Sequence, residues 1–189
     1  MTQRINVVGT SASGKTTFSK ALAQKMAVPH IEMDALNWQS NWEACTFEEL
    51  LIKLKQCLAA DSWILDGNYS KTTPVKWQNV DMVIWLDYGF GRNLYQSVSR
   101  TIRRLMSGTP LWEGTNNIES FQRAFLSGDS SIIWWMIKTH GKNQRKYQHI
   151  MANPEFAHIR FVRLTSPKQA RQFLQQFNAC YFLFKSDKN

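Results

Sequence analysis

Short apolar runs alternate along this chain with longer segments in which apolar residues recur at the spacing of a helix. Short runs are typical of buried strands, and a helical period is typical of helices that pack one face on a core. The expected strands are 4–8, 29–34, 62–66, 80–87 and 158–164, and the expected helices are 15–26, 46–60, 91–106, 118–126 and 131–151. This alternation predicts an α/β fold in which helices cover both faces of a parallel sheet.

The expected strands end in residues that suit a binding site. Gly9 follows the first strand closely, and Asp34, Asp66 and Asp87 end the second, third and fourth. In open parallel sheets, ligands bind beyond the carboxyl ends of the strands. We therefore expect the functional residues at this edge of the sheet.

The first strand leads into a phosphate-binding motif, Gly9-x-x-x-x-Gly14-Lys15-Thr16. Strand, glycine-rich turn and helix follow one another in the order that the motif requires, so an ordinary turn that happens to contain glycines is the weaker interpretation. Backbone N–H groups of such a loop converge on the phosphates of a nucleotide. The residues expected to bind it are Gly9, Ser11, Ala12, Ser13, Gly14, Lys15, Thr16 and Thr17.

Two side chains of the motif have distinct expected roles. Lys15 would reach the β- and γ-phosphates as a point charge, and Thr16 would offer its hydroxyl to Mg²⁺. The helix that begins there adds the positive end of its dipole. We expect ATP and Mg²⁺ as cofactors.

The bulk properties fit one domain, 1–189, that acts on something negatively charged. The chain carries a net charge of +9, and a length of 189 residues favours one domain with a full core. Its three cysteines, Cys45, Cys57 and Cys180, form no C-x-x-C pair or zinc spacing, which indicates reduced structural thiols. No leader pattern and no membrane-length apolar run stands out, so we expect a cytoplasmic protein without a membrane partner.

Positive charge concentrates in one part of the chain. Between Arg92 and Lys146 there are nine Lys or Arg residues and three acidic residues, which gives +6 of the total charge. The segment breaks the strand–helix alternation, and glycine and proline punctuate residues 107–117 within it. These features favour a helical lid, at about 100–150, that closes over phosphates. A helical hairpin with a solvated basic face is the simpler alternative.

Several segments resemble a known family. "GTSASGKTT", "MDALNW", "WILDGNYSKT" and "VDMVIWLD", with the arginine-bearing helix that follows, are similar to the small adenylate-kinase-like P-loop proteins of bacteria, many of them called DNA topology modulation proteins. The resemblance covers most of the chain and thins through 108–150. It implies a three-layer P-loop NTPase fold like that of nucleoside-monophosphate kinases, with five parallel strands, an acceptor-binding segment at about 34–72 and a helical lid.

The resemblance also implies roles for carboxylates. Asp66-Gly67 is similar to the Asp-Gly pair that ends the third strand of adenylate kinases, so Asp66 is expected to help hold Mg²⁺. Asp87 is its rival for that role. Asp34 resembles the acidic residue that orients or deprotonates the acceptor hydroxyl in shikimate- and gluconate-type kinases, although it could simply cap a helix.

Aromatic and basic residues complete the expected site. Trp38, Trp42 and Tyr69 could stack on a base or ring of the acceptor, or pack in the core. The residues expected to hold acceptor and transferred phosphates are Lys71, Arg92, Arg100, Arg103 and Arg104, with Arg100 and Arg104 assigned to catalysis. Lys71 stands where the family would be expected to carry arginine.

The leading hypothesis is a kinase that moves the γ-phosphate of ATP to a small acceptor such as a nucleotide or nucleoside. A nucleic-acid-associated ATPase is an alternative because of the basic surface, although the sequence has no helix-turn-helix, zinc-finger or RNA-binding signature. A nucleotide-controlled regulatory protein is another. Either a monomer or a homodimer agrees with the sequence.

Overall fold

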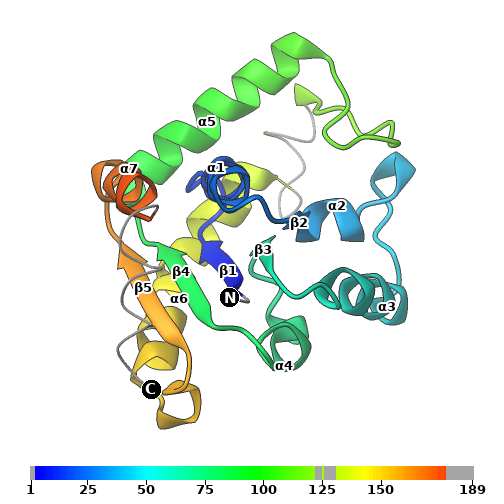
Figure 1. Ribbon diagram of the computed structural model, residues 1–189. Coiled ribbons are helices and arrows are strands. Elements are labelled where there is room, and N and C mark those ends of the chain that lie inside the picture. Colours follow the sequence, from blue (N-terminus) through cyan, green and yellow to red (C-terminus); the bar gives the residue numbers. More distant parts are fainter. Residues whose placement is uncertain (1–2, 122–124, 126–130, 178–189) are drawn as a thin grey trace.

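A parallel sheet forms the centre of the computed structural model, which describes residues 3–121, 125 and 131–177 (Figure 1). Within these residues the sheet has five strands in the order β2-β3-β1-β4-β5, and every neighbouring pair is parallel. The expected α/β fold is therefore confirmed. The strands are β1 (Arg4–Gly9), β2 (His30–Glu32), β3 (Trp63–Asp66), β4 (Met82–Leu86) and β5 (Arg160–Leu164).

Helices cover both faces of this sheet. They are α1 (Lys15–Met26), α2 (Met33–Asn37), α3 (Phe47–Leu58), α4 (Thr73–Lys76), α5 (Phe90–Ser107), α6 (Ile132–Ala152) and α7 (Pro167–Gln176). Short 3₁₀ turns lie at η1 (Ser40–Trp42), η2 (Ser70–Thr72) and η5 (Pro154–Phe156). Of the helix expected at 118–126, residues 118–120 are not helical, and 122–124 and 126 lie outside the described residues. Figure 1 shows α2 and α3 at the β2 side of the sheet and α7 at the β5 side.

The alternation of side chains along β1 divides the core in two. Ile5 and Val7 pack with α1 and α7 on one face, in a cluster that includes Leu22. Val8 points to the other face, where the core includes Leu54 of α3. Because successive side chains of a strand point to opposite faces, a central strand of a covered sheet is largely apolar on both. The buried Asn6 of β1 is an exception, and its side chain is hydrogen-bonded.

Local signals fix several boundaries. Thr46 accepts a hydrogen bond from the Glu49 backbone while the Glu49 side chain accepts one from the Thr46 backbone, which is the capping box that begins α3. The second strand is shorter than expected. It ends at Glu32, opposite the last residue of β3, so the chain has no strand partner beyond that point and turns into α2. Asp34 accordingly lies in the first turn of α2 and does not end a strand.

The thiols of Cys45 and Cys57 are free, as expected, and Cys180 lies outside the described residues. No helix in the described ranges is both long and apolar enough to cross a lipid bilayer.

His30 gives a pH prediction for stability. Burial, followed by the nearby charge of Lys20, lowers the pKa of His30 from 6.5 to about 4. As pH falls, His30 therefore takes up a proton near pH 6.5 in the unfolded chain but only near pH 4 in the folded chain. The free energy of unfolding consequently falls as pH falls between these two values. We expect His30→Gln to lose less stability than the unmodified protein between about pH 7 and about pH 5 in urea unfolding. An equal loss in both proteins would contradict this assignment.

Candidate active site

The phosphate-binding motif forms a tight loop between β1 and α1. The Ser13 N–H donates to the Thr10 carbonyl at 3.1 Å, and Gly14 ends the loop at φ 85°. A Cβ at Gly9 would lie 2.6 Å from the Leu86 carbonyl oxygen of the neighbouring strand. Glycine is thus required at Gly9 by the close approach of β4 and favoured at Gly14 by the left-handed backbone.

The loop leaves polar groups available to an anion. No side chain caps the N-terminus of α1 among the described residues. The half-buried Lys15 folds back over the loop, where its ammonium donates to the Thr10 carbonyl at 3.1 Å. The Ser13 hydroxyl is buried without a partner in the described structure. Burial lowers the pKa of Lys15, and the charges of Asp66 and Asp34 oppose this shift.

Thr16 and Asp66, the two residues predicted to hold Mg²⁺, contact each other directly. The Thr16 hydroxyl donates to Asp66 Oδ2 at 2.5 Å. Asp66 is buried, and its Oδ1 has no partner within the described residues. Burial raises the pKa of Asp66 to about 6 against the opposing charge of Lys15. A buried carboxylate with an unused oxygen beside a hydroxyl is a donor set that suits Mg²⁺, which commonly takes one or two carboxylates together with substrate phosphates.

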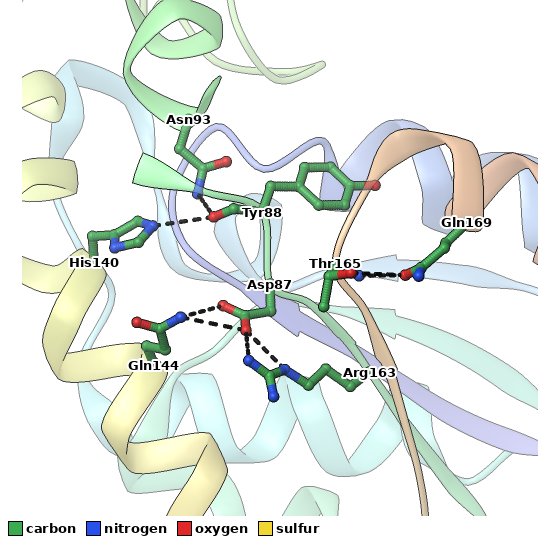
Figure 2. A network of polar contacts seen from close by, with 8 residues as sticks. All are labelled: Asp87, Tyr88, Asn93, His140, Gln144, Arg163, Thr165 and Gln169. Atoms are coloured by element: carbon green, nitrogen blue, oxygen red, sulfur yellow. Dashed lines mark hydrogen bonds and ion pairs between the residues drawn. The ribbon is translucent and has the colours of Figure 1, made fainter. Parts of the chain in front are cut away.

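Asp87 has different partners (Figure 2). Its Oδ2 accepts hydrogen bonds from Arg163 Nε at 2.8 Å and Nη2 at 2.5 Å, and Gln144 of α6 donates to both carboxylate oxygens. The guanidinium of Arg163 also lies 4.8 Å from the centre of the Trp85 ring. Asp87 therefore ties β4 to β5 and α6, and the structure does not bring it to Thr16.

The acceptor segment presents a carboxylate and aromatic rings. Tyr69 donates its hydroxyl to Asp34 Oδ1 at 2.8 Å, and Trp38 packs edge to face against Trp42 at 6.0 Å. Below Tyr69, a cavity of about 220 Å³ opens between α3 and η2. Its lining includes Lys71, Asn37, Cys45, Phe47 and Leu50. Asp34, Trp38, Tyr69 and Lys71 thus lie in or next to α2 and η2, with Asp34 and Tyr69 in contact.

The acceptor segment forms one wall of the site, the acceptor wall, with Asp34, Trp38 and Tyr69. Two further residues at this wall were not predicted from the sequence. Glu32 ends β2 beside Asp66, and its carboxylate accepts a hydrogen bond from Trp112 Nε1 at 3.2 Å. Trp112 extends the aromatic row by packing edge to face on Trp42 at 5.8 Å. The charge of Glu32 acts on Lys15 and Asp66, which places it with the predicted carboxylates. Its position two residues before Asp34, in the same expected strand, was the available signal.

The loop of the expected lid is fastened to the acceptor segment. Asn116 Nδ2 donates to Asn41 Oδ1 at 2.7 Å, and the Asn41 N–H donates back to Asn116 Oδ1 at 2.6 Å. The Asn117 side chain accepts from the Trp42 N–H and donates to the Gln39 carbonyl, each at 2.7 Å. These four bonds hold the loop that contains Trp112 against the acceptor wall.

The arginines of α5 divide into inward and outward groups. Arg100 is half-buried, with Nη2 3.5 Å from Ser11 Oγ of the phosphate loop, and burial followed by the charge of Arg104 lowers its pKa to about 10. Arg104 lies 4.0 Å from the buried carboxylate of Glu119. Arg103 and Arg92 are exposed. Arg92 lies in the first turn of α5 near Tyr88 and not at the acceptor wall.

Comparisons with known proteins rest on structure alone. No protein-family model and no curated protein matches the sequence. Shikimate kinase from Bacteroides thetaiotaomicron is similar with a TM-score of 0.50 at 14% identity, over 97% of this chain and all of that chain (100%). A gluconokinase from Sinorhizobium meliloti 1021 is similar with a TM-score of 0.51 at 16% identity, over 97% of both chains. The chain shares the fold of these two P-loop kinases. Its glycine-rich motif forms the loop between β1 and α1, with Lys15 and Thr16 at the start of α1.

Proposed function

We propose that the protein is a kinase that transfers the γ-phosphoryl group of ATP to a hydroxyl of a small acceptor such as a nucleotide or nucleoside. The observation that carries this proposal is the Thr16–Asp66 contact beside Lys15, which joins the phosphate loop to a buried carboxylate at the end of β3. In small P-loop kinases this arrangement holds the nucleotide and its metal next to the acceptor.

The reaction needs positioning and charge more than covalent help from the protein. The acceptor oxygen would form a bond to the γ-phosphorus as the bond to ADP breaks, and its proton would pass to Asp34 or to water. Lys15, which contacts Thr10, and Arg100, which contacts Ser11, would neutralise the phosphates bound at the loop. Mg²⁺, held by Thr16 and Asp66, would neutralise phosphate charge when bound. Tyr69 would fix Asp34 through its 2.8 Å hydrogen bond.

A second candidate, a nucleic-acid-associated ATPase, is favoured by the exposed arginines of α5 and by the resemblance to bacterial DNA topology modulation proteins. Acceptor-dependent release of ADP distinguishes the two candidates. We expect Mg-ATP to be consumed faster when one member of a pool of nucleotides, nucleosides and small hydroxy compounds is present. Turnover that responds to DNA and to no compound in the pool would favour the ATPase.

Arg100 and Arg103 form a matched pair for this choice, because one faces the phosphate loop and the other faces solvent. We expect Arg100→Gln to lower acceptor-dependent kcat by about 100- to 1000-fold, as removal of a preorganised donor commonly does, while Arg103→Gln leaves it unchanged. If both arginines instead track a nucleic-acid backbone, each variant should weaken DNA binding alike and lower the salt slope by about one unit. Steady-state kinetics and salt-dependent DNA titration give the two readouts.

A further inference from the structure

A buried lysine contacts the turn that follows Asp66. Lys76 ends α4 with only 1% of its surface exposed. Its ammonium donates to the Gly67 carbonyl at 3.3 Å and to the Asn68 carbonyl. Both acceptors belong to the turn that leaves β3 immediately after Asp66. Lys76 therefore fixes the backbone that follows the proposed metal carboxylate.

This ammonium is placed at an electrostatic cost. No carboxylate lies within ion-pair distance of Lys76 in the described part of the chain, and a buried charge without a counter-charge is unfavourable. Burial, followed by the charge of Lys146, lowers the pKa of Lys76 to about 7. Two backbone carbonyls compensate only part of that cost, so the position is poorly explained by stability alone.

Asn68 connects this turn to the phosphate loop. Its Oδ1 accepts a hydrogen bond from the Gly9 N–H at 3.0 Å, and its Nδ2 donates to the Gly9 carbonyl at 2.8 Å. The Tyr147 hydroxyl of α6 donates to the same Oδ1 at 3.1 Å. The Asn68 side chain is thus hydrogen-bonded to both the N–H and the carbonyl of Gly9, the first residue of the phosphate motif.

A second path braces the same turn from the sheet. Trp77, next to Lys76, donates its indole N–H to Asn6 Oδ1 at 2.8 Å. Asn6 Nδ2 donates to the Leu65 carbonyl of β3 at 3.0 Å and to the Gly67 carbonyl, which Lys76 also contacts, at 3.4 Å. Buried polar networks of this kind hold their members rigidly when each group is satisfied. α4 is therefore bonded both to β1 and to the turn after β3.

We propose that Lys76 is a positioning residue for nucleotide binding: it holds the Gly67–Asn68 turn so that Asn68 fixes Gly9 and the mouth of the phosphate loop beside Asp66. The inference rests on the proposed function, because it assumes that the loop binds a nucleotide. Lys76 acts through Asn68 and touches no phosphate itself.

The test is a double-mutant cycle measured by calorimetric titration with ADP. Lys76→Met keeps a side chain of similar length and removes the ammonium, and Asn68→Ala removes the bonds to Gly9. We expect each single variant to raise the Kd for ADP by about tenfold, because each leaves backbone groups beside the phosphate loop without their hydrogen-bond partner. If Lys76 acts through Asn68, the Kd of the double variant for ADP should equal that of whichever single variant binds ADP more weakly.

Leu54→Ala is the matched control, because Leu54 is fully buried in α3 and belongs to the core without sharing this network. It should lower thermal stability while leaving the Kd for ADP unchanged. Asn68→Ala keeps the ammonium and tests the inference even where Lys76→Met does not fold. An unchanged Kd for ADP in Asn68→Ala would overturn the inference. Additive effects of the two substitutions on the Kd would overturn it as well. Absence of ADP binding in the unmodified protein would overturn the proposed function together with it.

Discussion

Lys15→Ala is expected to lower ATP turnover by at least about a hundredfold and to weaken nucleotide binding, with the fold retained. The ammonium of Lys15 is the cation that the phosphate motif directs at the β- and γ-phosphates, and in the described structure it donates to the Thr10 carbonyl. Burial lowers its pKa in spite of the opposing charges of Asp66 and Asp34, so the charged form is disfavoured without a bound phosphate. Removing it should not unfold the chain.

Thr16→Ala separates metal effects from phosphate effects at the same loop. Its defect should shrink as Mg²⁺ concentration is raised, whereas the Lys15→Ala defect should not. Kinetic titration with Mg²⁺ and ADP calorimetry provide the measurements. Unchanged nucleotide affinity and turnover in Lys15→Ala would contradict the assignment of this loop as the phosphate-binding loop.

Asp66→Asn is expected to lower turnover by orders of magnitude with only a modest loss of nucleotide binding, since it replaces the carboxylate assigned to the metal. Its free energy of unfolding should not fall. Burial raises the pKa of Asp66 to about 6, so the ionised carboxylate is unfavourable in its surroundings and a neutral amide relieves that cost.

Asp87→Asn is the matched comparison, and it should show the opposite pattern. The Asp87 carboxylate accepts two bonds from Arg163, which a neutral amide cannot hold as an ion pair. We expect a loss of about 1 to 3 kcal/mol in stability, moderated by the partial exposure of Arg163, and near-normal kcat. Urea unfolding and steady-state kinetics on both variants decide the ranking, and the reverse order would overturn the assignment of Asp66.

Features set by neighbouring residues were predictable from sequence. The five strands follow from local apolar runs, and the phosphate loop follows from a motif whose residues all lie within nine positions of one another. The capping pair Thr46 and Glu49 likewise predicted the start of α3. These signals need no knowledge of tertiary structure, because the residues that specify each feature are adjacent in the chain.

Features set by distant residues were not. The Glu32–Trp112 bond spans 80 positions, and the Asn68–Gly9 pair spans 59. The turn from β2 into α2 at Met33 depends on where β3 ends, which no local pattern records. Arg100 and Arg103 look alike in sequence, since only the packing of α5 decides which of them faces the phosphate loop.

The central claim, that the γ-phosphoryl group of ATP passes to an acceptor, is tested most directly by following that group. The protein is incubated with ATP labelled in the γ-phosphoryl group and with the acceptor that stimulates ADP release, and the labelled products are separated. The proposed kinase predicts label in an organic phosphate ester, in proportion to the ADP formed. Label found only as inorganic phosphate, at a rate that no acceptor changes, would contradict it.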